Sequence, residues 1–345
     1  MKIIVSVLSD QLVPNILFVR QLEESYDKHI FISTSQMENK NKSSIFAGAL
    51  KLIKDDYKTL IVDPDDPLKI YQTLEKEKWD ETAKYLVNIT GGTKIMSQIV
   101  FSYFQKFNAT EIFYKPLNAK TLIQLYPNLK TLTIDKVYEL SLEEYLFAHG
   151  YTFTASRELT QSITNAEYLY EQICFYGDAS KVALIANAQD ANYNKKDKPY
   201  LTGAWFEEWV YYTIKEALQL SNNQIAYNLK LKSRFSNRNT DSDNEIDVAF
   251  IYENNLYLIE CKVYNKRQVD FSKISTAIYK ISSIGQSMGL KATAWVAICA
   301  SLGNSKQRMQ AINYLCRMTR VNQVFSLKEL RNKEEFITTL KKTFI

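Results

Sequence analysis

Short apolar runs alternate with amphipathic stretches along the first 140 residues of the chain. The apolar runs are rich in β-branched residues and predict strands at residues 2–8, 30–33, 59–63, 85–89 and 111–115. The stretches between them predict helices at about residues 14–25, 43–54, 67–78 and 94–107. Strands and helices in this alternation are typical of an α/β fold with a Rossmann-like, doubly wound sheet. Two further apolar runs, residues 122–126 and 131–137, predict two more strands, which an antiparallel edge would accommodate.

The pattern changes in the second half of the chain. Residues 141–195 are mainly helical in pattern and predict a linker or a small helical module before the polar stretch 192–199. Residues 196–345 then predict a mixed α/β domain. Its expected elements are a helix at about 203–220, a strand at 226–231, a polar loop at 233–244, paired strands at 246–252 and 256–263, a helix at about 270–288 and a strand at 293–300.

Bulk composition agrees with two domains in one chain. A length of 345 residues exceeds the size at which a single hydrophobic core usually stops growing. The four cysteines are scattered without CxxC spacing, which argues against a zinc ribbon and a disulfide framework and favours reduced thiols in the cytoplasm. The opening apolar run is too short for a signal peptide, and no later run approaches about 18 apolar residues, so we expect a soluble protein with no membrane partner.

Charge is distributed unevenly along the chain. Residues 196–345 contain 22 Lys and Arg against 14 Asp and Glu, a net charge of +8, although the whole chain has a formal net charge of only +5. A basic half that also contains a cluster of carboxylates favours a polyanionic substrate at a metal site. Unpatterned surface charge is the alternative interpretation.

The strongest candidate chemistry lies in the paired strands, where Asp247 is followed by the triplet Glu260-Cys261-Lys262. If Asn254 and Asn255 form a two-residue turn, Asp247 lies opposite Lys262, and Glu260 lies diagonal to Asp247 on the same face. Diagonal neighbours are roughly 7 to 8 Å apart, so both carboxylates could reach one divalent ion. A three-residue turn would reverse this parity. The alternative is a surface strand with a cross-strand ion pair, although the apolar neighbours of Glu260 make unpaired charge there costly.

Two carboxylates and a lysine suit phosphodiester hydrolysis, in which Mg²⁺ or Mn²⁺ polarises the phosphate and activates a water molecule. We expect Asp247 and Glu260 as metal ligands and Lys262 as their electrostatic partner. Glu207, on the helix at 203–220, is a candidate further ligand, and its neighbour Glu208 competes for that role. Lys280, in the helix after the triplet, is either an auxiliary phosphate contact or a solvated side chain.

These residues resemble the PD-(D/E)xK nucleases, with Asp247 as the first-motif aspartate and Glu260 and Lys262 as the (D/E)xK motif. Ile246 stands where the proline of the family name would be, which leaves the metal ligands intact. The resemblance implies a restriction-endonuclease-like domain and a metal-dependent endonuclease, with Asp247, Glu260 and Lys262 as its catalytic residues. From its place on the helix, we expect Glu207 to join them as a catalytic residue and metal ligand.

A second candidate site follows the expected strand at 85–89. Residues 88–96 read NITGGTKIM, in which Gly91 and Gly92 permit close backbone approach and Thr90, Thr93 and Lys94 add polar donors at a helix N-terminus. This is an anion or phosphate cradle at the carboxyl end of a strand. It is neither GxxxxGK[ST] nor GxGxxG, which argues against an ATPase or a dinucleotide enzyme. The polar loops 9–11 and 34–36 should share its sheet edge, although ordinary turn chemistry also accounts for them.

The TGGTK segment resembles the CARF domains of CRISPR-associated effectors, and the whole chain resembles CARF nucleases that cyclic oligoadenylate activates. The resemblance implies a homodimer that holds one cyclic oligoadenylate ring between its two sensor domains, with cyclic tetra-adenylate as the first candidate. It also implies a nuclease that cuts DNA, RNA or both without specificity in type III CRISPR antiviral defence. We therefore expect as ligand-binding residues those of the matching segment, Asn88, Thr90, Gly91, Gly92, Thr93, Lys94 and Met96, together with Ser9, Asp10 and Thr34 of the neighbouring loops.

Two other functions stay open at this point. The chain could be a nucleotide-sensing regulator that binds nucleic acid without cleaving it, although the intact carboxylates and lysine favour cleavage. The sensor could also cleave its own ligand. The only histidines are His29 and His149, and neither is near TGGTK in sequence, so we expect ligand uptake without turnover.

Overall fold

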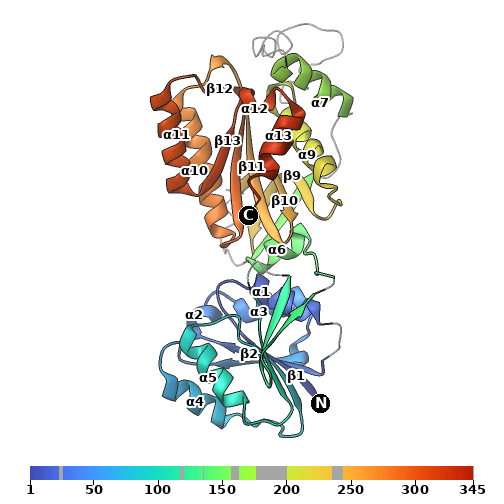
Figure 1. The fold of residues 1–345 in the computed structure, drawn as a ribbon, viewed down its shortest axis with the longest axis vertical. Helices are drawn as coiled ribbons and strands as arrows, with labels where there is room; N and C mark the ends of the chain where they lie inside the picture. The colour runs from blue at the N-terminus through green and yellow to red at the C-terminus, as the bar shows by residue number, and fades with distance from the viewer. Residues whose placement is uncertain are drawn as a thin grey trace. The chain divides into compact units, whose positions relative to one another are not determined.

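The computed structural model divides into two compact units, which are Met1–Leu140 with Phe147–Gly150, and Ser141–Leu146 with Tyr151–Ile345. Figure 1 shows the ribbon of both. The residues that the structure describes are 1–22, 26–116, 120–134, 136–156, 163–175, 200–234 and 244–344.

The first unit is built on a seven-stranded sheet with the order β3-β2-β1-β4-β5-β6-β7. Its strands are β1 (Lys2–Val7), β2 (Lys28–Ser33), β3 (Tyr57–Ile61), β4 (Lys84–Asn88), β5 (Thr110–Tyr114), β6 (Thr121–Tyr126) and β7 (Lys130–Thr133). The first five strands are parallel, and β6 and β7 add an antiparallel edge. The predicted doubly wound sheet is therefore confirmed, with β7 ending four residues before the predicted limit.

Helices cover both faces of this sheet. They are α1 (Val13–Gln21), α2 (Ser35–Glu38), α3 (Lys42–Leu50), the 3-10 turn η1 (Lys54–Asp56), α4 (Pro67–Lys76) and α5 (Lys94–Phe104). Ile3, Val5 and Val7 of β1 pack with α4 and α5, whereas Ile4 packs with Phe18 of α1 on the opposite face. Because β1 is buried on both faces, its sequence is an unbroken apolar run and does not alternate.

The direction of winding reverses between β1 and β4, which are neighbours in the sheet although β2 and β3 lie between them in the chain. Ligands of open α/β sheets bind beyond the carboxyl ends of strands at such a reversal. The segment after β4, residues 89–93, and the segment after β1, residues 8–12, both begin at this point.

The second unit contains a six-stranded sheet with the order β13-β12-β11-β10-β9-β8. The strands are β8 (Tyr151–Ser156), β9 (Ile225–Ser233), β10 (Asn244–Tyr252), β11 (Asn255–Gln268), β12 (Ala292–Ser301) and β13 (Val321–Phe325). Strands β8 to β11 are antiparallel, and β12 and β13 continue in parallel with β11. This mixed sheet confirms the mixed α/β fold predicted for the second half of the chain.

The helix α6 (Leu142–Ala148) is shared, because its last two residues belong to the first unit. The other helices described in the second unit are α7 (Ile163–Tyr170), α9 (Trp205–Leu218), α10 (Phe271–Ser287), α11 (Lys306–Thr319), α12 (Leu327–Leu330) and α13 (Lys333–Lys341), with π-helical turns η2 (Glu171–Phe175) and η4 (Tyr200–Ala204). Figure 1 shows α10 and α11 on one side of the sheet and α9 and α13 on the other. Tyr257 and Ile259 of β11 pack into the core with Trp209 of α9. Because side chains alternate along a strand, residues 258, 260 and 262 face α10.

The prediction for residues 141–195 differs from the structure in one respect. The segment Tyr151–Ser156 is the strand β8, which pairs with β9 at the edge of the second sheet, and is not helical. Most of its side chains alternate between partly buried and exposed positions. Over only six residues, this period of two is a weak signal in the sequence. Residues 176–199, and residues 235–243 of the predicted polar loop, lie outside the described residues.

No helix among the described residues is long and apolar enough to span a membrane.

Candidate functional site

The β10–β11 hairpin sets the position of the carboxylates. Its two-residue turn consists of Glu253 and Asn254, with φ of 49° and 60°, and Tyr252 pairs directly with Asn255. The predicted turn at 254–255 is therefore wrong by one residue, and the predicted pairing of Asp247 with Lys262 is wrong by two. Continuing the observed register from Val248 and Ile259 places Asp247 beside Glu260.

The observed register has a packing reason. It sets Phe250 opposite Tyr257, and their rings stack with centroids 5.0 Å apart and an interplanar angle of 17°. Such aromatic pairs stabilise a hairpin, and a turn one residue later would separate them. The predicted and the observed turn both contain two residues, so Asp247, Glu260 and Lys262 share one face of the hairpin, as predicted. Directly opposite residues are closer than diagonal ones, so the two carboxylates lie closer together than predicted.

Two buried carboxylates and two lysines form the site, which we call the carboxylate–lysine cluster: Asp247, Glu260, Lys262 and Lys280. Glu260 is fully buried, and Asp247 is 5% exposed. The Nζ of Lys262 lies 3.2 Å from Oδ2 of Asp247 and 2.6 Å from Oε1 of Glu260. The Nζ of Lys280, from α10, lies 2.8 Å from Oε1 and 2.7 Å from Oε2 of Glu260. The backbone N–H of Cys261 donates to Oδ2 of Asp247 at 2.6 Å.

The pKa values show that these charges interact. Burial and the charge of Asp247 raise the pKa of Glu260, and Lys262 and Lys280 oppose the increase. Burial acts to lower the pKa of Lys262, but the charges of Asp247 and Glu260 outweigh burial and raise it. Buried charges of this kind are stable only when paired or bound to a cation.

The structure distinguishes the two adjacent glutamates of α9. Burial and then the charge of Asp247 raise the pKa of Glu207 to about 8, with Lys262 opposing, so Glu207 lies within electrostatic reach of the cluster. Glu208 is fully buried and accepts a hydrogen bond of 3.0 Å from the hydroxyl of Tyr227. The electrostatics therefore favour Glu207 over Glu208 as a further carboxylate beside the cluster.

The donor set fits a hard divalent cation. Within the described ranges, no group of three or more His, Cys, Asp and Glu residues forms a ready-made metal site. Mg²⁺, however, is usually held by one or two carboxylates, with water and substrate phosphate completing its shell. Asp247 and Glu260 supply two adjacent buried carboxylates whose repulsion is offset by ammonium groups, which is the environment that a cation stabilises.

The TGGTK loop of the first unit is held rigidly between β4 and α5. The side-chain oxygen of Asn88 accepts from the N–H of Thr90 at 3.1 Å and from its hydroxyl at 2.5 Å. Thr93 caps α5 by accepting from the N–H of Met96 at 3.2 Å, and its hydroxyl donates to the carbonyl of Pro64 at 2.7 Å. Gly91 lies so close to β1 that a Cβ there would be 2.2 Å from the Val7 carbonyl oxygen.

The exposed part of this loop is cationic. Lys94 is exposed at the first position of α5, and the first turn of that helix contains no acidic residue. A helix N-terminus carries partial positive charge and favours anions, so an ammonium group beside it is complemented by a bound phosphate. This local geometry agrees with the expected anion cradle.

The structure brings most of the other predicted ligand residues to the same sheet edge. Ser9 and Asp10 follow β1, and Thr34 follows β2 and caps α2 by accepting from the N–H of Met37. Asp10 is paired with Lys40, at 2.7 Å from its Nζ, a contact that the sequence did not predict. The side chains of Asn88 and Met96 are buried, and Met96 packs in the core with α4. These two residues therefore shape the loop from within.

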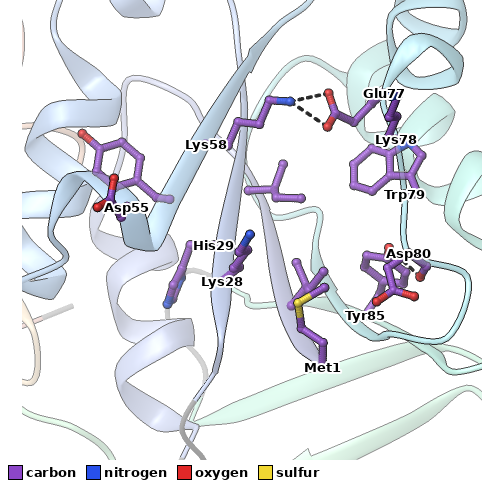
Figure 2. A pocket seen from close by; sticks show the side chains of 13 residues that line it. Met1, Lys28, His29, Asp55, Lys58, Glu77, Lys78, Trp79, Asp80 and Tyr85 are labelled. Carbon is purple, nitrogen blue, oxygen red and sulfur yellow. Dashed lines mark hydrogen bonds and ion pairs between the residues drawn. The ribbon is translucent and has the colours of Figure 1, made fainter.

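A cavity of about 260 Å³ lies at the opposite edge of the first sheet, near the amino ends of its strands (Figure 2). Lys58 donates to both carboxylate oxygens of Glu77 at 2.7 Å across its rim. None of the residues predicted to bind a ligand lines it. The lining residues are Met1, Ile3, Lys28, His29, Ile30, Asp55, Tyr57, Lys58, Glu77, Lys78, Trp79, Asp80 and Tyr85.

Comparisons with known proteins agree with both units. VC1899 from Vibrio cholerae is 16% identical, with a TM-score of 0.74 over 99% of this chain and 98% of that one. Can2 from Sulfobacillus thermosulfidooxidans, solved in complex with cyclic tetra-adenylate, is 21% identical, with a TM-score of 0.69 over 99% of both chains. A type III CRISPR defence DNA nuclease activated by cyclic oligoadenylate is 14% identical, with a TM-score of 0.56 over 86% of this chain and 45% of that one. These likenesses concern the fold.

No curated protein sequence matches the chain. Family models do match, and they cover most of it. Residues 3–145 match the model of the Card1 CARF domain, and residues 194–336 match the model of the Card1-like endonuclease domain. The chain therefore belongs to the CRISPR-associated CARF-domain nucleases of the Card1 kind, with a CARF domain followed by a Card1-like endonuclease domain.

Proposed function

We propose that this nuclease hydrolyses phosphodiester bonds with Mg²⁺ or Mn²⁺ held by Asp247, Glu260 and Glu207. The observation that carries the proposal is the carboxylate–lysine cluster, in which two buried carboxylates lie side by side and pair with two lysines. When bound, the metal polarises the phosphate and supplies an activated water molecule.

The chain's own groups have distinct parts in this reaction. Asp247 is fixed by the Cys261 N–H at 2.6 Å, so one of its oxygens is oriented before any metal arrives. Lys262 keeps its ammonium group beside both carboxylates, where it stabilises the negative charge that develops on phosphoryl oxygens. Glu207 completes the acidic set at the cluster's edge.

We propose that the first unit binds a cyclic oligoadenylate as its activator, with cyclic tetra-adenylate as the first candidate. Support comes from the CARF family match over residues 3–145 and from the likeness to Can2, which was solved in complex with cyclic tetra-adenylate. The anion cradle at Thr93 and Lys94 supplies amides, a hydroxyl and an ammonium group for phosphates. A ring of four identical nucleotides suits a two-fold homodimer, in which each chain contributes one cradle.

The substrate that we propose is DNA, RNA or both, cut without sequence preference in type III CRISPR antiviral defence. The net charge of +8 over residues 196–345 favours a phosphate backbone as partner. We assign sensing to residues 1–140 and cleavage to residues 196–345. Residues 141–195 connect them and contribute β8 to the second sheet.

Variants at the cluster test this function. Glu260→Ala and Lys262→Ala should each abolish cleavage of labelled DNA and RNA, because loss of a ligand or of the compensating charge removes several kcal/mol of transition-state stabilisation. Both should bind cyclic tetra-adenylate as the wild type does, and EDTA should stop the wild-type reaction. Full cleavage by Glu260→Ala in added Mn²⁺, or by the wild type in EDTA, would place the chemistry elsewhere.

A further inference from the structure

Lys280 is the member of the cluster that the nuclease motif does not contain. It lies on α10, 20 positions after Glu260, and reaches back across the face of β11 to that carboxylate. Its Nζ is within 2.8 Å of both Glu260 oxygens and 3.9 Å from Oδ1 of Asp247. This ion pair with a fully buried carboxylate holds the ammonium group of Lys280 within the site.

The contact with both Glu260 oxygens has a consequence for metal binding. An ammonium group spread across a carboxylate occupies the side from which a divalent ion would bind the same two oxygens. A metal ion held by Glu260 would also stand within a few ångströms of this second positive charge, and like charges at that separation repel strongly when partly buried. Lys280 and the metal therefore compete for Glu260.

The charges around Glu260 agree with this competition. Without metal, Asp247 and Glu260 carry two negative charges, and Lys262 and Lys280 carry two positive charges, so the four groups are balanced. A bound divalent ion would add positive charge, so one of the two ammonium groups would no longer be needed to balance the carboxylates. Lys262 also donates to the carbonyl of Cys261 at 3.0 Å, whereas the ammonium group of Lys280 contacts the two carboxylates that the metal would take.

The released ammonium group has a place to go. The Lys280 side chain is 38% exposed, whereas both carboxylates are buried, so it can move toward solvent, from which a phosphate enters. We propose that Lys280 is a further catalytic residue: it holds Glu260 in the metal-free protein and, once metal displaces it, binds the phosphate that is cleaved. This inference rests on the proposed nuclease function.

Two opposite effects distinguish this role from a structural one. In Lys280→Gln, the metal no longer competes with an ammonium group, so Mn²⁺ should bind about fivefold to tenfold more tightly. The same variant lacks a phosphate contact, so kcat at saturating metal and activator should fall about 100-fold or more, as for loss of one preorganised donor. Lys280→Arg keeps the charge and should retain the Mn²⁺ affinity of the wild type and most of kcat.

Lys273 provides a matched control. It lies on the same helix, seven residues before Lys280 and so on the same stripe, but its Nζ sits 5.2 Å from the ring centroid of Tyr264, and it forms no ion pair with a carboxylate in the described part of the chain. Lys273→Gln removes the same charge from the same helix face. Its Mn²⁺ affinity and its kcat at saturating metal should remain within about twofold of the wild type.

Mn²⁺ affinity should be measured by calorimetry on the full-length variants without nucleic acid, and kcat with labelled DNA and RNA at saturating cyclic tetra-adenylate. Tighter Mn²⁺ binding with lower kcat in Lys280→Gln alone supports the proposal. Unchanged or weaker Mn²⁺ binding in a folded Lys280→Gln variant overturns the proposal. If Lys280→Gln does not fold, loss of Mn²⁺ binding in Lys280→Arg overturns it instead. A wild type that binds Mn²⁺ without cutting either substrate refutes the nuclease function but leaves the competition testable by calorimetry.

Discussion

The cradle at the start of α5 makes a prediction that separates ligand binding from stability. Lys94 is exposed, and it stands at the positive end of the helix dipole, where a cation is unfavourable by about 0.3 to 1 kcal/mol. Lys94→Ala should therefore leave the free energy of unfolding of the free protein unchanged or raise it by up to about 1 kcal/mol. A lysine that is neutral or costly in the free protein is explained by an anion that it binds.

The expected loss of activator affinity follows from the contact that the lysine makes. A charge-assisted hydrogen bond from an ammonium group to a phosphate is worth roughly 1.5 to 3 kcal/mol, so one lost contact weakens binding about tenfold to 150-fold. If each chain of a dimer contributes one Lys94 to a shared ring, the variant loses two such contacts. The variant does not change the carboxylate–lysine cluster, so saturating activator should partly restore cleavage.

The assay compares three proteins: wild type, Lys94→Ala and Lys106→Ala. Lys106 follows the other end of α5, where it pairs with Glu75, and serves as a lysine away from the cradle. Activator titrations of cleavage give the half-maximal concentration, and thermal unfolding without ligand gives stability. If Lys94→Ala responds at the wild-type concentration of cyclic tetra-adenylate, or if Lys106→Ala shifts it equally, Lys94 does not bind the activator.

Two further predictions concern the first unit. Gly91→Ala should destabilise it by about 1 to 3 kcal/mol and weaken activation, because a Cβ there meets the Val7 carbonyl oxygen at 2.2 Å. As a control in the second unit, Gly203→Ala, with no heavy atom within 4 Å, should change stability by less than about 0.5 kcal/mol. Denaturant melts that rank the two variants in the opposite order would contradict the steric argument. Burial lowers the pKa of His29 to about 4 from 6.5, so protonation of His29 favours the unfolded chain. The free energy of unfolding should be highest above pH 6.5 and should be lower by about 2 kcal/mol at pH 5. Urea unfolding of His29→Leu should lack this part of the pH dependence, and an identical dependence in both proteins would show that His29 is not its source.

The parallel sheet of the first unit was predictable because its signal is local. A strand such as β1, buried on both faces, must be apolar at every position, and the helices between such strands show their own period. The strand β8 was missed because Tyr151–Ser156 is a short edge strand with only partial burial, which leaves a weak pattern.

The sequence predicted which face of the hairpin carries the candidate site, but not the register of the two strands. An even number of turn residues fixes which side chains share a face, and both the predicted and the observed turn contain two. The register depends on which residues adopt positive φ, and Glu253 is an unusual residue to do so. The stacking of Phe250 on Tyr257 favours the observed register, and this contact across the hairpin is not specified by the local sequence.

The contact between Lys280 and Glu260 depends on how α10 packs against β11, so the sequence left two interpretations of Lys280 open. A lysine in a helix has no local signal that separates a buried ion pair from a solvated side chain. The structure resolves the question because both oxygens of a fully buried carboxylate face its amine.

The central claim is that a cyclic nucleotide at the first unit controls cleavage at the second. Moving a nuclease from 1% to 99% active requires about 5.5 kcal/mol of difference in ligand affinity between the two states. The most direct measurement is therefore the cleavage rate of the wild type in Mn²⁺ as cyclic tetra-adenylate is titrated, with binding stoichiometry measured alongside. We predict negligible cleavage without the ring, a rise of up to about 100-fold, and saturation at one ring per two chains. Equal cleavage with and without cyclic oligoadenylate would contradict the account.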